Sequence, residues 1–428
     1  METNLLQSIL ETPEGREADA ILRACVHCGF CTATCPTYQL LGDELDGPRG
    51  RIYLIKQALE GEAVTAKTQL HLDRCLTCRS CETTCPSGVR YGRLVDIGRK
   101  FVDDRVGRPP VEAAKRSALR RGLLSRSMFG AALTLGRFAR PFMPRSLASS
   151  IPEGRKAGTW PAPRHARRVL IALGCVQPSL APNIDAATAR VLDRAGISAI
   201  GVDGGGCCGA LPYHLSEHDE ARELARRNID AWWPHVEGGA EAIVVTASGC
   251  GVMVRDYGLV LAQDPLYADK AARVAALARD PVEIVAAEWP RIVTGLAKAR
   301  TRQTLAFHPP CTLQHGMRLA GAVEPLLRDA GYALVPVADA HLCCGSAGTY
   351  SILQPGIAGE LKSNKLRALE AGRPQVIATA NIGCMTHLQS GTQIPIRHWI
   401  ELVDAAASNS ARPATANRLR TGEAAPTS

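Results

Sequence analysis

The sequence predicts a helical N-terminal domain followed by two repeated α/β domains whose sheets are mainly parallel. Three observations support this fold class. Two four-cysteine runs recur within the first 100 residues, and the apolar residues between them recur at helical spacing. Strand-like and helix-like segments then alternate from residue 166 to residue 402, which indicates parallel sheets. Eight further cysteines in that half form two similar sets, which indicates a domain-scale duplication.

Composition narrows the classes of protein to consider. The chain has 428 residues, of which 46% are hydrophobic, so it can bury two or three cores. Aromatic residues make up only 4%, which argues against base stacking and a nucleic-acid partner despite a net charge of +9. Sixteen cysteines without a secretory leader predict a reducing cytoplasm and metal binding. The sequence contains no run of 18 or more apolar residues, so we expect no membrane span.

The composition also suggests domain boundaries. We expect a helical domain at 1–100, a basic helical linker at 101–165, a first α/β repeat at 166–300, a second at 301–405 and a disordered tail at 406–428. In the repeats, we expect strands at 169–173, 197–202, 243–246, 304–307, 333–337 and 376–379. The helices between them are expected at 184–195, 219–232 and 357–371, with a further one ending at 330.

Both N-terminal cysteine runs have the form C-x-x-C-x-x-C-x-x-x-C-P. The first run contains Cys25, Cys28, Cys31 and Cys35, and the second contains Cys75, Cys78, Cys81 and Cys85, so the offset is 75 − 25 = 50 residues. Two intervening residues let one loop hold three corners of a [4Fe-4S] cluster, and the fourth cysteine of such a run ligates the other cluster in two-cluster ferredoxins. Structural zinc does not need this third cysteine, and disulfides need an oxidising compartment.

The spacing therefore predicts two [4Fe-4S] clusters with crossed fourth ligands. The first cluster is expected on Cys25, Cys28, Cys31 and Cys85. The second cluster is expected on Cys75, Cys78, Cys81 and Cys35. His27 and the other residues between the cysteines are interpreted as lining of the clusters.

The linker alternates basic and apolar residues. The arginines that alternate with apolar residues are Arg116, Arg120, Arg121, Arg126, Arg137, Arg140 and Arg145. A basic amphipathic helix of this kind can lie on a membrane surface. The alternative is a linker helix that packs on the next domain and leaves its arginine face in water.

The C-terminal half carries its own cysteine repeat. One set contains Cys175, Cys207, Cys208 and Cys250, and the other contains Cys311, Cys343, Cys344 and Cys384. The offsets are 311 − 175 = 136, 343 − 207 = 136 and 384 − 250 = 134 residues. Each set follows predicted strands, and ligand sites in open α/β sheets gather at the carboxyl ends of strands. Two adjacent cysteines do not chelate one ion comfortably, so they bind different irons of a cluster or act as redox-active thiols.

These sets resemble the cysteine-rich (CCG) domain of heterodisulfide-reductase-type proteins, because each pair is followed by glycine, at Gly209 and Gly345. The fullest form of that motif has a fifth cysteine, which is Met253 in the first repeat and His387 in the second. Histidine replaces cysteine in Rieske centres, so an additional cluster is favoured in the second repeat. Buried or redox-active thiols are the alternative. His308 and His315 are interpreted as polar pocket residues.

The whole layout, from about residue 18 to residue 402, resembles the iron–sulfur subunits of bacterial glycolate oxidases. The likeness is closest in residues 21–51, 71–75 and 82–90. It implies partner subunits that carry FAD and oxidise glycolate to glyoxylate, with D-lactate as a second substrate. This chain would pass electrons toward quinone from the cytoplasmic face of the inner membrane, and no residue of it is expected to be catalytic or to bind a nucleotide.

Other functions stay open at this point. The same clusters would suit a subunit of a glycerol-3-phosphate or D-lactate dehydrogenase. The second cysteine repeat would suit a heterodisulfide-reductase-like protein that transfers electrons between thiols and disulfides. A metal-binding scaffold without redox function is the remaining alternative.

Overall fold

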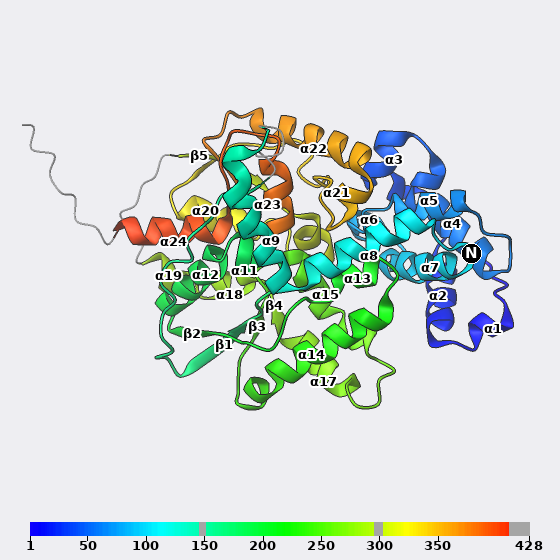
Figure 1. The fold of residues 1–428 in the computed structure, drawn as a ribbon, viewed down its shortest axis with the longest axis horizontal. Coiled ribbons are helices and arrows are strands. Elements are labelled where there is room, and N and C mark those ends of the chain that lie inside the picture. The colour runs from blue at the N-terminus through cyan, green and yellow to red at the C-terminus, as the bar shows by residue number, and fades with distance from the viewer. Residues whose placement is uncertain (145–150, 295–302, 411–428) are drawn as a thin grey trace, which may run out of the picture.

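The computed structural model describes residues 1–144, 151–294 and 303–410. Figure 1 shows a helical N-terminal domain at one end of the molecule and two α/β repeats at the other. Each repeat contains a four-stranded sheet in which all neighbouring strands are parallel. The predicted fold class is therefore confirmed.

The N-terminal domain consists of short helices. They are α1 (Gln7–Leu10), α2 (Pro13–Ala24), η1 (Phe30–Thr34), α3 (Pro36–Leu41), η2 (Glu44–Asp46), α4 (Pro48–Leu59), α5 (Ala66–Asp73), α6 (Ser80–Thr84) and α7 (Tyr91–Val106). Proline begins α2, α3 and α4, where its missing N–H group would have no helical partner anyway. Leu22, Ile55 and Leu94 are fully buried in the core of the domain. The helices hold the two cysteine runs in the connections between α2 and α3 and between α5 and α7.

Two further helices form the linker. They are α8 (Pro110–Leu124) and α9 (Arg126–Ala139), followed by the short turn η3 (Arg140–Phe142). The predicted domain boundary at residue 100 falls inside α7. Some linker arginines bind neighbouring residues: Arg116 pairs with Asp73 at 3.0 Å, and Arg126 donates to the carbonyl of Leu173 at 3.1 Å. The linker therefore packs on both neighbouring domains. Arg145 lies outside the described residues.

The two repeats have the same sheet topology. The first contains β1 (Arg167–Ile171), α11 (Gln177–Leu180), α12 (Asn183–Arg194), β2 (Ile197–Gly201), α13 (Ala210–His214), α14 (His218–Glu237), β3 (Ile243–Val244), α15 (Ser248–Arg255), α16 (Tyr257–Val260), α17 (Ala268–Leu277), β4 (Ala278–Arg279), α18 (Pro281–Ala287) and α19 (Trp289–Val293). The second contains β5 (Thr304–His308), η4 (Thr312–Gly316), α20 (Val323–Asp329), β6 (Ala333–Leu334), α21 (Tyr350–Leu353), α22 (Pro355–Glu370), β7 (Val376–Thr379), α23 (Ile382–Gln389), β8 (Ile396–His398) and α24 (Trp399–Ser410). The strand orders are β2-β1-β3-β4 and β6-β5-β7-β8, which correspond position by position.

Some predicted elements differ from the structure. Strands β4 and β8 are missing from the prediction, since each pairs over only two or three residues at a sheet edge. Helix α20 begins only at Val323, because Pro309 and Pro310 interrupt the segment and a single π-helical turn follows. The predicted tail begins too early, since α24 continues to Ser410. The rest of that tail (411–428) and the predicted boundary at residue 300 lie outside the described residues.

The repeats share one hydrophobic core. Helix α24 of the second repeat packs on α12 of the first, and the core extends through both sheets. Arg190 and Arg194 of α12 both pair with Asp404 of α24, at 2.7 and 2.9 Å. The two repeats are therefore packed together as one body. The eight cysteines of this half follow the carboxyl ends of its strands.

Candidate metal centres

The first thiol group combines three cysteines of the first run with one of the second. Cys25 and Cys28 lie between α2 and η1, Cys31 lies in η1, and Cys85 joins them in lining one small cavity. Burial, followed by the charge of Cys25, raises the pKa of Cys31 to about 11. A thiol with that pKa is protonated at neutral pH unless a cation replaces the proton. The group therefore suits a positively charged centre.

The second thiol group has the reciprocal composition. Cys75, Cys78 and Cys81 line a second small cavity together with Cys35 from the first run. Burial raises the pKa of Cys81 well above its usual value, and the charges of Cys78, Cys75 and Cys35 add to the shift. The structure thus brings together each predicted ligand set, with the fourth cysteines exchanged. Ligation of iron by these residues remains a prediction.

The two cysteine loops have the same backbone conformation. His27 and Thr77, which differ by 50 positions, have φ angles of +60° and +51°. Gly29 and Arg79, again 50 positions apart, have φ angles of +84° and +59°. Left-handed residues at corresponding positions bend each loop around its cavity, and at Arg79 this conformation is held without glycine. The sequence duplication is therefore also a duplication of loop geometry.

A buried charge network supports the second group. Asp46 is completely buried and pairs with Arg51, which is 1% exposed, and with Arg74 at 2.7 Å. Arg51 also donates to the carbonyl of His71 at 2.7 Å. The charges of Cys75 and Cys35 contribute to a raised pKa of Arg51, although burial acts in the opposite direction. Sequence reasoning missed this network. Its signal is an arginine within the apolar stripe of α4.

One thiol pair of the second repeat lies against this second group. The sulfur atoms of Cys311 and Cys343 are 3.7 Å apart. Cys343 shares a small apolar cluster with Leu76 and Cys78 of the N-terminal domain. Hydrogen bonds from the Cys311 and Cys344 thiols lower the pKa of Cys343 well below its usual value. The predicted redox-active or cluster-binding thiols therefore adjoin a predicted cluster site.

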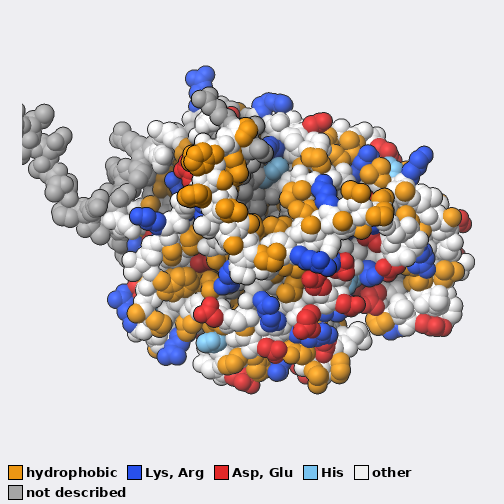
Figure 2. All heavy atoms as spheres, in the orientation of Figure 1, with side chains coloured by type: hydrophobic (Ala, Val, Ile, Leu, Met, Phe, Trp, Pro, Cys, Tyr) orange, Lys and Arg blue, Asp and Glu red, His pale blue; other side chains and the backbone are white. Residues whose placement is uncertain are grey.

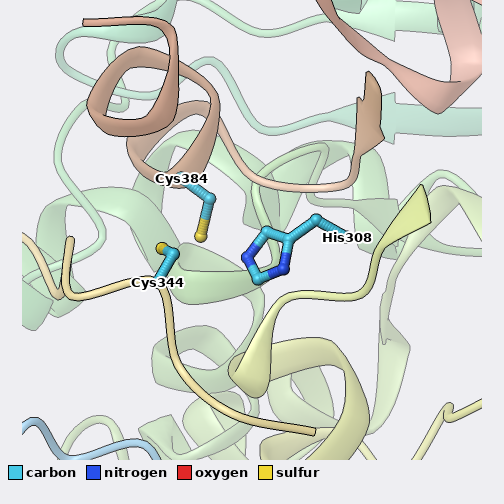
Figure 3. A group of neighbouring side chains, drawn as sticks. All are labelled: His308, Cys344 and Cys384. Carbon is cyan, nitrogen blue, oxygen red and sulfur yellow. The ribbon is translucent and has the colours of Figure 1, made fainter. Parts of the chain in front are cut away.

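The other two cysteines of this repeat converge on a different residue from the predicted one. A ring nitrogen of His308 and the sulfur atoms of Cys344 and Cys384 all lie within 4.8 Å of one another (Figure 3). His387, the predicted fifth donor, instead directs Nε2 to the carbonyl of Ala358 at 3.4 Å. His308 was interpreted only as a pocket residue. Its position at the end of a strand, three residues before Cys311, is the signal that could have identified it.

The first repeat is arranged differently. Interactions among its thiols and burial raise the pKa of Cys175, Cys207 and Cys208, and Cys250 adjoins Cys208. Met253, at the fifth motif position, is buried in an apolar cluster. No group of three converging histidine, cysteine or carboxylate donors occurs in the described residues of this repeat. Among the described residues, three donors therefore converge in the second repeat and not in the first, and an additional cluster there stays a prediction.

The surface near the linker carries exposed apolar side chains. Met128, Leu135 and Phe138 lie on one face of α9, and Phe142 follows in η3. Figure 2 shows hydrophobic side chains over this part of the molecule, with Lys and Arg among them. None of the helices in the described parts of the chain is long and apolar enough to cross a membrane.

Comparisons with known proteins agree with this geometry. Residues 21–89 match the family described as 4Fe-4S dicluster domain, and residues 169–255 and 305–389 match the family described as cysteine-rich domain. The chain is 56% identical, over 95% of its length and 99% of the relative, to the glycolate oxidase iron-sulfur subunit of Escherichia coli K12. It is 29% identical, over 86% of its length and 88% of the relative, to a probable glycolate oxidase iron-sulfur subunit of Bacillus subtilis. Lactate utilization protein A of an Exiguobacterium strain is 24% identical over 55% of this chain and 96% of the relative.

Proposed function

Since this chain belongs to the family of glycolate oxidase iron–sulfur subunits, we propose that it transfers electrons from FAD-bearing partner subunits toward quinone. The partners would oxidise glycolate to glyoxylate. The observation that carries the proposal is the pair of four-thiol groups with exchanged fourth cysteines. Two such groups, side by side in one small domain, suit single-electron transfer over a short distance.

The donor sets fit two [4Fe-4S] clusters. Each group offers four thiols around a cavity, and the described chain holds them on loops of matching conformation. We assign Cys25, Cys28, Cys31 and Cys85 to one cluster and Cys75, Cys78, Cys81 and Cys35 to the other. When bound, such clusters accept and release single electrons. Cys35, Cys75 and Cys81 of the second group are buried, and Arg51 lines the same cavity with a positive charge.

The first group has a surface that suits a partner subunit. Cys28 is exposed, and so are Val26, Phe30 and Tyr53 around it. Exposed apolar residues at a redox site are typical of an interaction surface. We propose that a flavin-bearing subunit docks here, because the second group is covered by the second α/β repeat through Leu76 and Tyr350.

We also propose peripheral attachment to the cytoplasmic face of the inner membrane. The support is the apolar face of α9 with Phe138 and Phe142, which are 77% and 85% exposed. The internal pairing of Arg116 and Arg126 weakens the electrostatic part of this proposal. Contact with the membrane would therefore rest mainly on apolar burial.

D-lactate is proposed as a second substrate of the complex. The supporting observation is the similarity of over half of this chain to lactate utilization protein A. A complex specific for D-lactate or glycerol 3-phosphate is the alternative, and a thiol–disulfide role is a further one, favoured by the short Cys311–Cys343 distance.

One experiment tests the central proposal. The native complex is purified anaerobically through a tag on this chain, and dye reduction is measured with glycolate, D-lactate and glycerol 3-phosphate. We expect co-purifying flavoproteins, glycolate-dependent reduction and about eight irons from the two N-terminal groups. A tagged chain that carries the iron but isolates without flavin and without glycolate-dependent reduction would refute the proposed partners.

A further inference from the structure

The group formed by His308, Cys344 and Cys384 lies at the carboxyl ends of the second sheet. His308 is the last residue of β5, Cys344 lies in the connection between β6 and α21, and Cys384 is in the first turn of α23, just after β7. Figure 3 shows the three side chains beside one another. Three separate segments thus place two sulfur atoms and one imidazole nitrogen within 4.8 Å of one another.

His308 has an unusual environment for a buried histidine. It is 1% exposed, and neither Nδ1 nor Nε2 has a hydrogen-bond partner among the described residues. Buried polar groups are almost always paired, so an imidazole without partners indicates a ligand. By contrast, His315 contacts Thr83 at 2.8 Å and His387 contacts a backbone carbonyl. His308 is therefore the one of these three histidines whose ring is left for another group.

We propose that His308, Cys344 and Cys384 bind a single thiophilic divalent cation, with zinc as the best-fitting ion. One neutral imidazole and two thiolates form a ligand set that zinc uses with a fourth position left open. Two thiolates and a divalent cation sum to zero charge, which suits a site where Cys344 is 1% and Cys384 6% exposed. The inference does not depend on the proposed electron-transfer function.

A single ion fits these residues better than an additional cluster. A cluster built on the adjacent cysteines would also need Cys343 and Cys311, whose sulfur atoms lie 3.7 Å apart and pack toward the N-terminal domain. The fifth donor of the cysteine-rich motif would be His387, which directs its nitrogen to Ala358 instead. The thiols of Cys343 and Cys344 are in contact, but Cys343 packs toward the N-terminal domain, and only Cys344 and Cys384 lie together with His308.

The first repeat provides an internal control. The position that corresponds to His308 is 308 − 136 = 172, which is alanine. Cys208 and Cys250 correspond to Cys344 and Cys384, so the first repeat has both thiols but no imidazole. We therefore expect the ion only in the second repeat.

The test measures zinc and iron together in the full chain, purified anaerobically without chelator and supplied with zinc. We expect about one zinc per chain, with the iron of the N-terminal groups unaffected. His308→Ala and Cys384→Ser should lose the zinc and keep the iron, whereas His387→Ala and Cys250→Ser should keep both. His308→Cys should retain zinc, because it restores a third ligand. This variant separates ligation from a purely structural role of the imidazole.

Cobalt(II) titration gives a second measurement on the unsubstituted chain. A tetrahedral site with two thiolates should give intense visible and near-ultraviolet absorption that saturates at one cobalt per chain, and His308→Ala should abolish it. The proposal is overturned if the unsubstituted chain binds neither zinc nor cobalt here. It is also overturned if His308→Ala retains zinc, or if Cys384→Ser loses iron, which would indicate an additional cluster.

Discussion

Arg51 and Asp46 are buried charges inside a small helical domain. Such pairs contribute little net stability, but removal of one partner leaves the other as an uncompensated buried charge. Asp46 retains Arg74 and His71 as neighbours when Arg51 is replaced, whereas the carbonyl of His71 loses its donor. The network therefore joins η2, α4 and α5 around the second thiol group.

We expect Arg51→Met to lower the free energy of unfolding by about 1–3 kcal/mol, because the carbonyl of His71 loses its donor while Asp46 keeps Arg74 as a partner. Anaerobic denaturant unfolding of the iron-loaded chain would measure it. Arg49→Met is the matched control, because Arg49 pairs with Glu44 at the surface, with both side chains more than one third exposed. That substitution should change stability by less than about 1 kcal/mol. Equal effects of the two substitutions would contradict the role assigned to the network.

Asp280 should make stability depend on pH. Burial raises the pKa of this carboxyl to about 7, and its Oδ1 accepts a hydrogen bond from the N–H of Val282 at the start of α18. Because the pKa is higher in the folded state than in the unfolded state, the protonated form stabilises the fold. This contribution is complete below pH of about 4 and is lost as pH rises through about 7.

We therefore expect Asp280→Asn to flatten the dependence of stability on pH. The amide oxygen of asparagine can still accept the hydrogen bond from Val282 at the start of α18. The melting temperature of the unsubstituted chain should fall relative to that of the variant between pH 5.5 and 8. Thermal unfolding at several pH values in this range would measure the difference. Parallel curves for the two proteins would show that Asp280 is ionised throughout.

The glycine after each cysteine pair sets how closely that loop approaches a helix. A Cβ atom on Gly345 would lie 2.6 Å from the carbonyl oxygen of Ala358 in α22, and one on Gly209 would lie 3.0 Å from that of Ala221 in α14. Both glycines have positive φ angles, of +85° and +89°. The Cys-Cys-Gly sequence therefore reflects helix packing as well as thiol chemistry.

Gly345→Ala should lower the melting temperature and loosen the loop that carries Cys343 and Cys344. Gly348→Ala is the matched control, since Gly348 also has a positive φ angle, +63°, but no atom within 4 Å of the added Cβ. The control carries only the left-handed backbone penalty, about 1–2 kcal/mol, and the clash adds to it at Gly345. Thermal unfolding gives the melting temperatures of the two variants. Equal destabilisation would show that the added methyl group at residue 345 does not clash with Ala358.

The apolar face of α9 predicts binding to lipid vesicles. We expect Phe138→Glu and Phe142→Glu each to weaken binding to anionic vesicles about tenfold or more, because burial of a phenylalanine contributes about 1.5–3 kcal/mol. Vesicle flotation of the purified chain would measure this. Leu266→Glu serves as the control, because Leu266 is similarly exposed, at 79%, but lies in the first repeat outside α9. Unchanged binding by the α9 variants would place any membrane contact elsewhere.

At the scale of the whole molecule, the exchanged cysteines link the two cysteine runs. Cys35→Ala should impair the cluster held mainly by the second run, and Cys85→Ala the one held mainly by the first. Each variant should lose up to about four irons, and electron paramagnetic resonance of the reduced chains should show complementary residual signals. If Cys35→Ala abolished the signal that persists in the triple variant of Cys75, Cys78 and Cys81, the crossed assignment would be wrong.

Much of the fold could be predicted because it repeats. Alternation of strands and helices, together with the 136-residue offset, predicts two parallel α/β repeats, and the sheets have matching strand orders. The short edge strands could not be predicted, since two residues such as Ala278 and Arg279 carry no periodic pattern. The packing of α24 on α12 is also absent from the sequence pattern, because it depends on contacts between residues 200 positions apart.

The candidate sites were predictable where spacing alone decides the geometry. The two N-terminal thiol groups follow from local spacing and a known exchange of ligands. In the second repeat, the motif position favoured His387 as a donor. His387 lies on helix α23, however, and its side chain faces the carbonyl of Ala358 instead. His308 reaches Cys344 and Cys384 because β5 ends beside β7, which only the sheet topology determines.

The exchange of Cys35 and Cys85 also has a consequence for synthesis on the ribosome. A nascent chain that ends before residue 75 presents three thiols of the first group and one of the second, so neither four-thiol group is complete until the second run emerges. The segment between them, α3 to α5, joins the two runs that contribute to each group. Assembly of the two proposed clusters should therefore follow synthesis of both runs and not begin on the first run alone.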